Sequence, residues 1–215
     1  MKNKKLTIGI SLRIVESTDY NEKRDALSQD WSILFEKLGI NPLLIPNTMK
    51  NVLSFLEDMQ VQGLILSGGD NIGDSQDRDE TEQKIINYSL EKKIPLIGIC
   101  RGMQVINTFF GGTIETLENS KHVGDHHFVS LNKNFASFLH TEKLQVNSFH
   151  NNVINQKNLG KNLEPFAMAN DNTIEGFYHT ELPIVGVMWH PERTPNEKNE
   201  QIIRKIFYDK RNFLE

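Results

Sequence analysis

The sequence has little cysteine, no long apolar run and no excess of positive charge. One cysteine stands among its 215 residues, so no intramolecular disulfide can form and a reducing compartment is expected. No apolar run approaches the ~18 residues of a membrane span. The short apolar segment Leu6–Leu12 lacks the features of a signal peptide. The sequence therefore predicts a cytoplasmic protein that does not cross a membrane.

The charge balance argues against polyanionic partners. Asp and Glu number 28 against 24 Lys and Arg, which gives a formal net charge of −4. Such a chain has no general attraction for nucleic acid or anionic lipid, and we expect neither as a partner. The 38% hydrophobic and 24% charged residues are those of an ordinary globular protein. Because no linker, repeat or low-complexity tract divides the sequence, we expect one domain over residues 1–215.

The first half of the chain alternates apolar strand-like runs with helical patterns. The expected strands are Leu6–Ser11, Pro42–Ile45, Val61–Leu66 and Ile94–Ile99. The expected helices are Ser28–Leu38, a segment carrying Val52 to Met59, Thr81–Lys92 and Gly102–Phe110. A polar, acidic loop is expected to follow Ser67-Gly68-Gly69-Asp70 and to extend to about Asp79. This alternation predicts parallel pairing and a three-layer α/β fold with a mostly parallel central sheet.

The second half shows shorter runs that are typical of strands and hairpins. They are Phe128–Leu131, Leu144–Ser148, Pro165–Ala169, Thr173–Tyr178 and Ile184–Trp189. A C-terminal helix is expected from Asn196 onward. We therefore expect additional β-hairpins on a mostly parallel central sheet.

The segment around Cys100 has the pattern of a nucleophile elbow. An apolar strand runs into Cys100 and a helix follows, with Gly98 and Gly102 two positions away on either side. The positive end of the helix dipole would face the thiol. The backbone N–H of Arg101 would be placed to bind an oxyanion. A buried cysteine at the end of a strand is the alternative interpretation.

Two further segments could complete a cysteine-based site. His190 follows a strand, and Glu192 lies two residues later, where an extended backbone turns both side chains to one side. A carboxylate that orients an imidazole base is what a cysteine nucleophile requires. Gly68 and Gly69 end another strand and could turn a second N–H toward an oxyanion. A strand-end histidine and an ordinary glycine turn are the alternatives.

The joint order of these segments resembles the class I glutamine amidotransferase superfamily, in its γ-glutamyl hydrolase (peptidase C26-like) branch. The matching segments are Ser67-Gly-Gly-Asp70, Arg78-Asp79-x-x-Glu82, Gly98-Ile-Cys-Arg-Gly-Met-Gln104, Gly111-Gly-Thr113, Val146-Asn-Ser148, Glu175-Gly176 and Gly186-Val-Met-Trp-His-Pro-Glu192. The resemblance covers nearly the whole chain. It implies a flavodoxin-like three-layer fold and needs no cofactor or metal.

The resemblance also implies a role for each site residue. Cys100 is the nucleophile, His190 the base and then the acid, and Glu192 the residue that orients His190. The oxyanion rests on the N–H of Arg101 and on that of Gly68 or Gly69. Residues expected to bind the substrate are Arg101, Gln104, Phe149, His150 and Asn151. Where the branch often reads Ser-x-His-His-Gln, this chain has Ser148-Phe-His-Asn-Asn152.

At a finer level the chain resembles the γ-glutamyl-CDP-amidate hydrolases of bacterial capsule biosynthesis. These release glutamate from cytidine-diphosphate glutamine and leave a phosphoramidate for a capsular sugar. A nucleotide diphosphate leaving group requires cations, and the candidates are Arg78, Arg101, Lys121 and Arg193.

Other functions stay open from the sequence alone. They are a γ-glutamyl-GABA hydrolase, a glutaminase subunit that supplies ammonia to a separate synthase, and a fold relative that only binds a ligand. The expected partner is a small-molecule substrate, and the oligomeric state, monomer or homodimer, stays open from the sequence.

Two polar clusters are interpreted without a metal. His122, His126 and His127 surround Gly124 and are expected on a polar loop near the site. The acidic run from Asp70 to Glu80 lacks the spacing of a calcium loop and is expected to be solvated.

Overall fold

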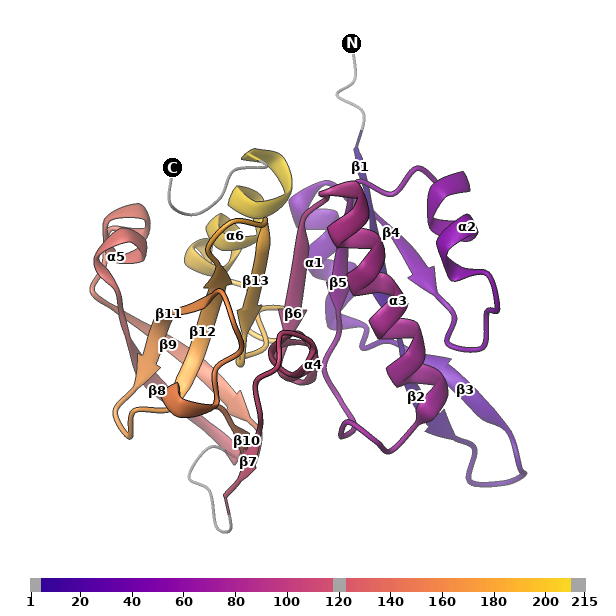
Figure 1. Ribbon diagram of the computed structural model, residues 1–215, viewed down its shortest axis with the longest axis horizontal. Helices are drawn as coiled ribbons and strands as arrows, with labels where there is room; N and C mark the ends of the chain where they lie inside the picture. The colour runs from indigo at the N-terminus through magenta and orange to yellow at the C-terminus, as the bar shows by residue number, and fades with distance from the viewer. Residues whose placement is uncertain (1–4, 118–122, 210–215) are drawn as a thin grey trace.

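The computed structural model describes residues 5–117 and 123–209, and a nine-stranded sheet runs through it (Figure 1). The strand order is β4-β1-β5-β6-β13-β12-β11-β8-β9. The strands of this sheet are β1 (Leu6–Ser11), β4 (Ile40–Ile45), β5 (Gly63–Leu66), β6 (Leu96–Ile99), β8 (Val123–Leu131), β9 (Lys143–Phe149), β11 (Leu163–Ala169), β12 (Ile174–His179) and β13 (Ile184–Val187). Two small sheets pair β2 (Arg13–Glu16) with β3 (Lys23–Ala26), and β7 (Glu115–Thr116) with β10 (Asn152–Val153).

The helices lie on both faces of the large sheet. They are α1 (Asp30–Leu38), α2 (Val52–Asp58), α3 (Gln76–Lys92), α4 (Arg101–Phe109), α5 (Lys133–Leu139) and α6 (Glu197–Arg204). A 3-10 turn forms at Gln156–Asn158, and a π-helical turn, Lys205–Asp209, continues α6. This is the three-layer α/β arrangement that the alternating pattern predicts.

The sheet divides into a parallel half and an antiparallel half. From β4 to β13 each neighbouring pair is parallel, whereas from β13 through β12, β11 and β8 to β9 each pair is antiparallel. The antiparallel half comprises the hairpins expected in the second half of the sequence. The α/β fold, with a parallel core to its sheet and additional hairpins, is thus confirmed.

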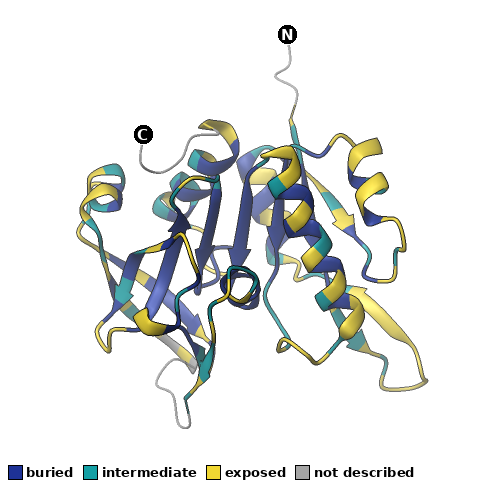
Figure 2. Cartoon of the chain, in the orientation of Figure 1, coloured by how far each residue is buried: buried dark blue, intermediate teal, exposed yellow. Residues whose placement is uncertain are grey.

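Apolar side chains fill the space on each side of the sheet. One cluster packs α1, α5 and α6 against the sheet through residues such as Trp31, Phe135 and Ile202. The other packs α2, α3 and α4 through residues such as Val52 and Ile85. Figure 2 shows the central strands as buried and the outer surfaces of the helices as exposed. The two clusters hold the strand ends that carry the site in fixed positions.

Two local expectations are wrong, and some elements were not expected. Helix α3 begins at Gln76, so Asp77 and Asp79 lie in its first turn and not in a solvated loop. The residues on the buried side of this turn are polar, so the apolar periodicity from which a helix is predicted is absent there. His126 and His127 lie on strand β8, not on a loop, and His122 lies outside the described residues. The hairpin β2–β3 and helix α5 have no counterpart among the expected elements.

Within residues 5–117 and 123–209, no helix combines the length and the apolar character needed to cross a bilayer.

Candidate active site

Cys100 and His190 follow neighbouring parallel strands. Strands β6 and β13 pair in register, with Ile99 opposite Val187. The N–H of Cys100 donates to the carbonyl of Val187 at 2.8 Å. Because parallel strands end at the same edge of a sheet, the nucleophile candidate and the base candidate leave the sheet side by side.

Cys100 occupies a tight turn between β6 and α4. Its φ of 51° and ψ of −105° are an unusual backbone conformation for a residue other than glycine. Gly102 packs so closely on β5 that a Cβ there would lie 2.2 Å from the carbonyl oxygen of Leu66. The side chain of Cys100 therefore projects from a sharp strand-to-helix turn at the start of α4, as the nucleophile-elbow pattern predicts.

His190 is held by a carboxylate and by an amide side chain. Its Nδ1 lies 2.7 Å from Oε1 of Glu192, and both residues are buried. Asn147 fixes the backbone of His190, because its Oδ1 accepts from the His190 N–H and its Nδ2 donates to the His190 carbonyl, each at 2.8 Å. With Nδ1 engaged by Glu192, the ring's other nitrogen, Nε2, remains for Cys100.

The pKa of His190 is raised to about 9 from an ordinary value of 6.5. Burial by itself lowers this pKa, but hydrogen bonds to Cys100 and Glu192 and their negative charges outweigh burial. The imidazole is therefore protonated at neutral pH, beside the sulfur. A protonated base next to a cysteine is suited to give a proton to a leaving group.

The Gly68–Gly69 loop and the start of α4 both lie beside Cys100. A Cβ on Gly68 would lie 2.7 Å from Cε1 of His190 and 3.5 Å from Cβ of Cys100, so only glycine fits there. Gly69 and Arg101 line the cavity described below. Among the described residues, no backbone or side-chain acceptor receives the N–H groups of Gly68, Gly69 and Arg101. These are the N–H groups that the resemblance assigns to an oxyanion.

A cavity of about 620 Å³ opens over Cys100. The expected residues that line it are Gly69, Cys100, Arg101, Gln104, Phe149, His150, Asn151 and His190. Gly68 and Glu192 lie behind it, together with His190, around a smaller hollow. The sequence-predicted residues are thus brought together at one place. The volume exceeds that of a single amino acid and lies in the range typical of ligand pockets.

The wall opposite the parallel strands carries polar side chains. Gln104 is buried, and its Oε1 accepts from Nδ2 of Asn152 at 3.4 Å. Nδ1 of His150 lies 3.0 Å from the carbonyl oxygen of Asn152, and its Nε2 lies 3.5 Å from Oε1 of the buried Glu175. Asn151 is exposed at the cavity rim. These groups could accept the charged end of a small polar ligand.

The candidate cations differ in their surroundings. The guanidinium of Arg101 is buried and paired with Asp79 and Glu82, so it is not a free cation in the cavity. Arg78 is fully buried and paired with Glu82. Arg193 lines the cavity, with its guanidinium carbon 4.5 Å from the ring centroid of Phe149. Lys121 lies outside the described residues. Of the expected cations that are described, Arg193 is the one that faces the cavity.

Some residues of the site were not singled out from the sequence. Asn147 holds His190, although it belongs to the Val146-Asn-Ser148 segment of the resemblance. Asn71 and Ile72, which follow the Ser67-Gly-Gly-Asp70 segment, line the cavity together with Asp70. They follow β5, and polar residues after a parallel strand are the signal that could have indicated them.

A metal centre finds no support in the part of the chain that is described. No group of three or more His, Cys, Asp or Glu side chains there is arranged to hold a metal ion.

Comparison with known proteins identifies relatives of this chain. Residues 7–192 match the family described as Peptidase C26. The chain is 38% identical over 207 residues to the γ-glutamyl-CDP-amidate hydrolase of Campylobacter jejuni, covering 93% of this chain and 96% of that one. It is 32% identical over 170 residues to a subunit of the glutamine-hydrolysing GMP synthase of Pyrococcus abyssi, covering 79% and 85%.

Among solved structures, a provisional GMP synthase subunit from Thermoplasma acidophilum superposes with a TM-score of 0.72 at 24% identity, covering 95% of this chain and 94% of that one. This likeness confirms the expected class I glutamine amidotransferase fold. Since the family match spans most of the chain and the Campylobacter relative aligns over nearly its whole length, the chain belongs to the peptidase C26 family and is a hydrolase of carbon–nitrogen bonds.

Proposed function

We propose that this protein hydrolyses a γ-glutamyl amide bond and releases L-glutamate, with Cys100, His190 and Glu192 as its catalytic triad. The carrying observation is that Cys100 and His190 meet at the floor of one cavity while Glu192 holds Nδ1 of His190 at 2.7 Å. The cavity also offers N–H groups from two separate segments.

The first half of the reaction forms a thioester. The sulfur of Cys100, as thiolate, attacks the γ-carbonyl carbon, and the carbonyl electrons move to an oxyanion that the N–H groups of Arg101 and of Gly68 or Gly69 stabilise. The oxyanion then collapses and the carbon–nitrogen bond breaks. Nε2 of His190 gives its proton to the departing nitrogen, so the amine leaves neutral.

The second half regenerates the enzyme. His190, now neutral, takes a proton from water, and the hydroxide attacks the thioester carbon. The carbon–sulfur bond breaks, the thiolate returns and glutamate leaves. Glu192 stabilises the imidazolium in both halves and keeps Nε2 turned toward the sulfur.

The polar wall of the cavity is suited to the amino-acid end of the substrate. Gln104, His150 and Asn151 lie within it and offer donors and acceptors for an α-amino and an α-carboxyl group. Phe149, which is 43% exposed, stands at the rim beside His190 with their ring centroids 5.9 Å apart. The leaving group would pass this rim as it departs.

We propose γ-glutamyl-CDP-amidate as the substrate, which would give cytidine diphosphoramidate for capsular polysaccharide modification. The Campylobacter relative carries this activity in its name, and the cavity is larger than glutamine requires. Arg193 and Phe149 together present a cation and an aromatic face, which suit a phosphate and a base. A γ-glutamyl-GABA hydrolase is the alternative within the same chemistry.

A glutaminase that works within a larger synthase is the second candidate function. The Pyrococcus relative favours it, since its name makes it one subunit of a glutamine-hydrolysing GMP synthase. A protein of this kind would release ammonia from free glutamine and would need a synthase partner.

The test is an assay of the purified chain with four compounds: cytidine-diphosphate glutamine, γ-glutamyl-GABA, γ-glutamyl anilide and glutamine. Glutamate and ammonia are measured separately, with Cys100→Ala as the control. Glutamate without ammonia from the nucleotide substrate supports the proposal. Ammonia from glutamine alone supports the synthase-linked glutaminase, and turnover that survives in Cys100→Ala overturns the cysteine mechanism.

A further inference from the structure

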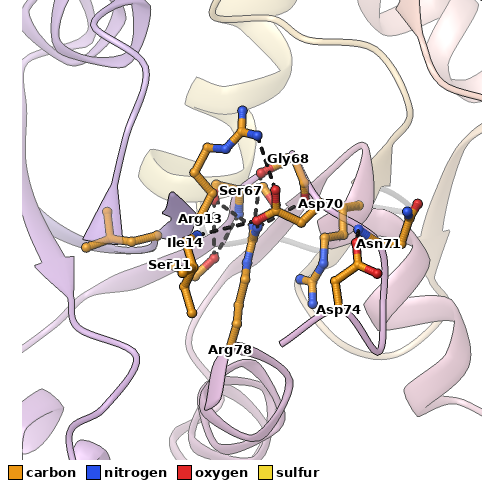
Figure 3. Close-up of polar contacts among 12 residues, drawn as sticks. Ser11, Arg13, Ile14, Ser67, Gly68, Asp70, Asn71, Asp74 and Arg78 are labelled. Atoms are coloured by element: carbon orange, nitrogen blue, oxygen red, sulfur yellow. Dashed lines mark hydrogen bonds and ion pairs between the residues drawn. The ribbon is translucent and has the colours of Figure 1, made fainter. Parts of the chain in front are cut away.

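A buried group of charged side chains lies beneath the Ser67–Gly69 loop. Arg78 and Glu82 stand one turn apart on α3, both with 0% exposure, and Nε of Arg78 lies 3.1 Å from Oε1 of Glu82. Figure 3 shows Arg78 reaching from α3 toward Ser67, Gly68 and Asp70. Burying an ion pair has a large desolvation cost, so a pair in this position is weak evidence for stability. Its contacts indicate another role.

Arg78 binds the loop through three successive carbonyl groups. Its Nη2 donates to the carbonyl oxygens of Ser67 and Gly68, and its Nη1 to that of Gly69, each at 3.0 Å. In a planar trans peptide the C=O and the N–H point in opposite directions. Drawing the carbonyls of Ser67 and Gly68 toward Arg78 therefore turns the N–H groups of Gly68 and Gly69 away from it.

The opposite side of the loop is the reaction centre. A Cβ on Gly68 would meet His190 and Cys100, which places the loop directly against both. The N–H groups that Arg78 turns are thus those assigned above to the oxyanion. Asp70 further fixes the end of this loop, because Nη1 of Arg78 and Nη2 of Arg13 bind its two carboxylate oxygens at 3.0 and 3.1 Å.

Glu82 connects this loop to the other source of oxyanion donors. Its Oε1 accepts from Arg78 and from Oγ of Ser11, the latter at 2.8 Å. Its Oε2 binds the guanidinium of Arg101, which also contacts Asp79. Arg101 directly follows Cys100 and offers the second N–H. The Glu82 carboxylate therefore contacts both Arg78, which binds the Gly68–Gly69 loop, and Arg101, which carries the other proposed oxyanion donor.

We propose that Arg78 and Glu82 are positioning residues that set the spacing between the Gly68–Gly69 N–H groups and the Arg101 N–H. Neither side chain touches the substrate. They act by fixing two backbone segments against each other, so their effect falls on the charged transition state and not on substrate binding. This inference rests on the proposed cysteine mechanism.

Two substitutions test the network. Glu82→Gln keeps the shape of the side chain and removes its charge. Arg78→Lys keeps the charge, but a single ammonium cannot replace the planar fork that reaches three carbonyls. For each variant we expect kcat with γ-glutamyl anilide to fall by about 100-fold while KM changes less than twofold, since a misplaced donor affects the transition state alone. Arg204→Lys is the matched control, because Arg204 donates to the carbonyls of Lys37 and Leu38 on another part of the chain.

Alkylation of Cys100 by iodoacetamide separates positioning from general damage. This reaction needs the thiolate but forms no oxyanion, so its rate should stay within twofold of wild type in both variants. Unchanged kcat in either variant overturns the inference. A parallel fall in kcat and in alkylation also overturns it, because the damage would then lie at Cys100 itself. The proposed function fails on a different result, which is turnover that survives in Cys100→Ala.

Discussion

The parallel and antiparallel halves of the sheet bring different groups to one cavity. The parallel half supplies Cys100 after β6, His190 after β13 and the glycine loop after β5. The antiparallel half supplies Phe149 and His150 at the end of β9. Reacting groups thus come from strand ends that meet at one edge, whereas Phe149, His150 and Asn151 of the cavity wall come from the end of a hairpin strand. Such a division lets substrate preference change without moving the nucleophile.

The strongest test of this division is removal of the nucleophile. Cys100→Ala should lower kcat/KM by at least about ten-thousand-fold, because no other group in the cavity can form the thioester. The melting temperature should stay near that of wild type. Steady-state assays and a thermal melt check both. If a His150→Ala variant lost as much activity as Cys100→Ala, the division between the two halves would be broken.

The next largest effect is expected at Glu192. Glu192→Gln should lower kcat by on the order of 100- to 10,000-fold, because the imidazolium loses the charge that stabilises it. The pKa of His190 is raised to about 9, so the protonated form that serves the leaving group is lost as the pH rises through about 9. Protonated His190 also stabilises the folded state. This contribution to folding stability is fully present below about pH 6.5 and is lost as the pH rises through about 9.

The pH profile of Glu192→Gln therefore gives a second readout. Without the carboxylate the pKa of His190 falls, and the alkaline limb of kcat should move to lower pH. A limb that stays in place would show that Glu192 does not control the charge of His190. The profile is measured with γ-glutamyl anilide over pH 6 to 10. This range spans the ordinary pKa of histidine, 6.5, and the raised pKa of His190, about 9.

A smaller, selective effect is expected at the rim. Arg193→Ala should raise KM for the nucleotide substrate by about 10- to 100-fold, the equivalent of one lost charge-assisted contact. Turnover of γ-glutamyl anilide should change less than threefold, since that leaving group has no charge for Arg193 to bind. The ratio of the two kcat/KM values is the measurement. An unchanged ratio contradicts the assignment of Arg193 to the leaving group.

The smallest effect on turnover is expected in the core of the antiparallel half. Phe135 of α5 stacks on Phe166 of β11, with ring centroids 3.8 Å apart. Phe135→Leu should lower the free energy of unfolding by about 1–3 kcal/mol and leave kcat unchanged at low temperature. Urea denaturation checks this, with Phe128→Leu at an exposed position of strand β8 as the control. A fall in kcat would show that this packing reaches the reaction centre.

The parts of this molecule that the sequence predicts are those with a one-dimensional signal. Buried strands such as Val61–Leu66 appear as apolar runs, and Cys100 and His190 stand where two such runs end. The start of α3 has no such signal, because its buried residues Arg78 and Glu82 are polar. Only the three-dimensional arrangement shows their partners. For the same reason the sequence gives no sign that the side chain of Arg101 pairs with two carboxylates of α3.

The close contact between Gly102 and the carbonyl of Leu66 limits how this chain can change over evolutionary time. Most surface positions of the hairpins tolerate exchange, since a new side chain there extends into solvent. At Gly102 even a methyl group would force α4 away from β5, and with it the turn that carries Cys100. The lack of a side chain at Gly102 therefore holds the floor of the cavity in place, and substitutions that leave Cys100 undisturbed are expected at the cavity walls instead.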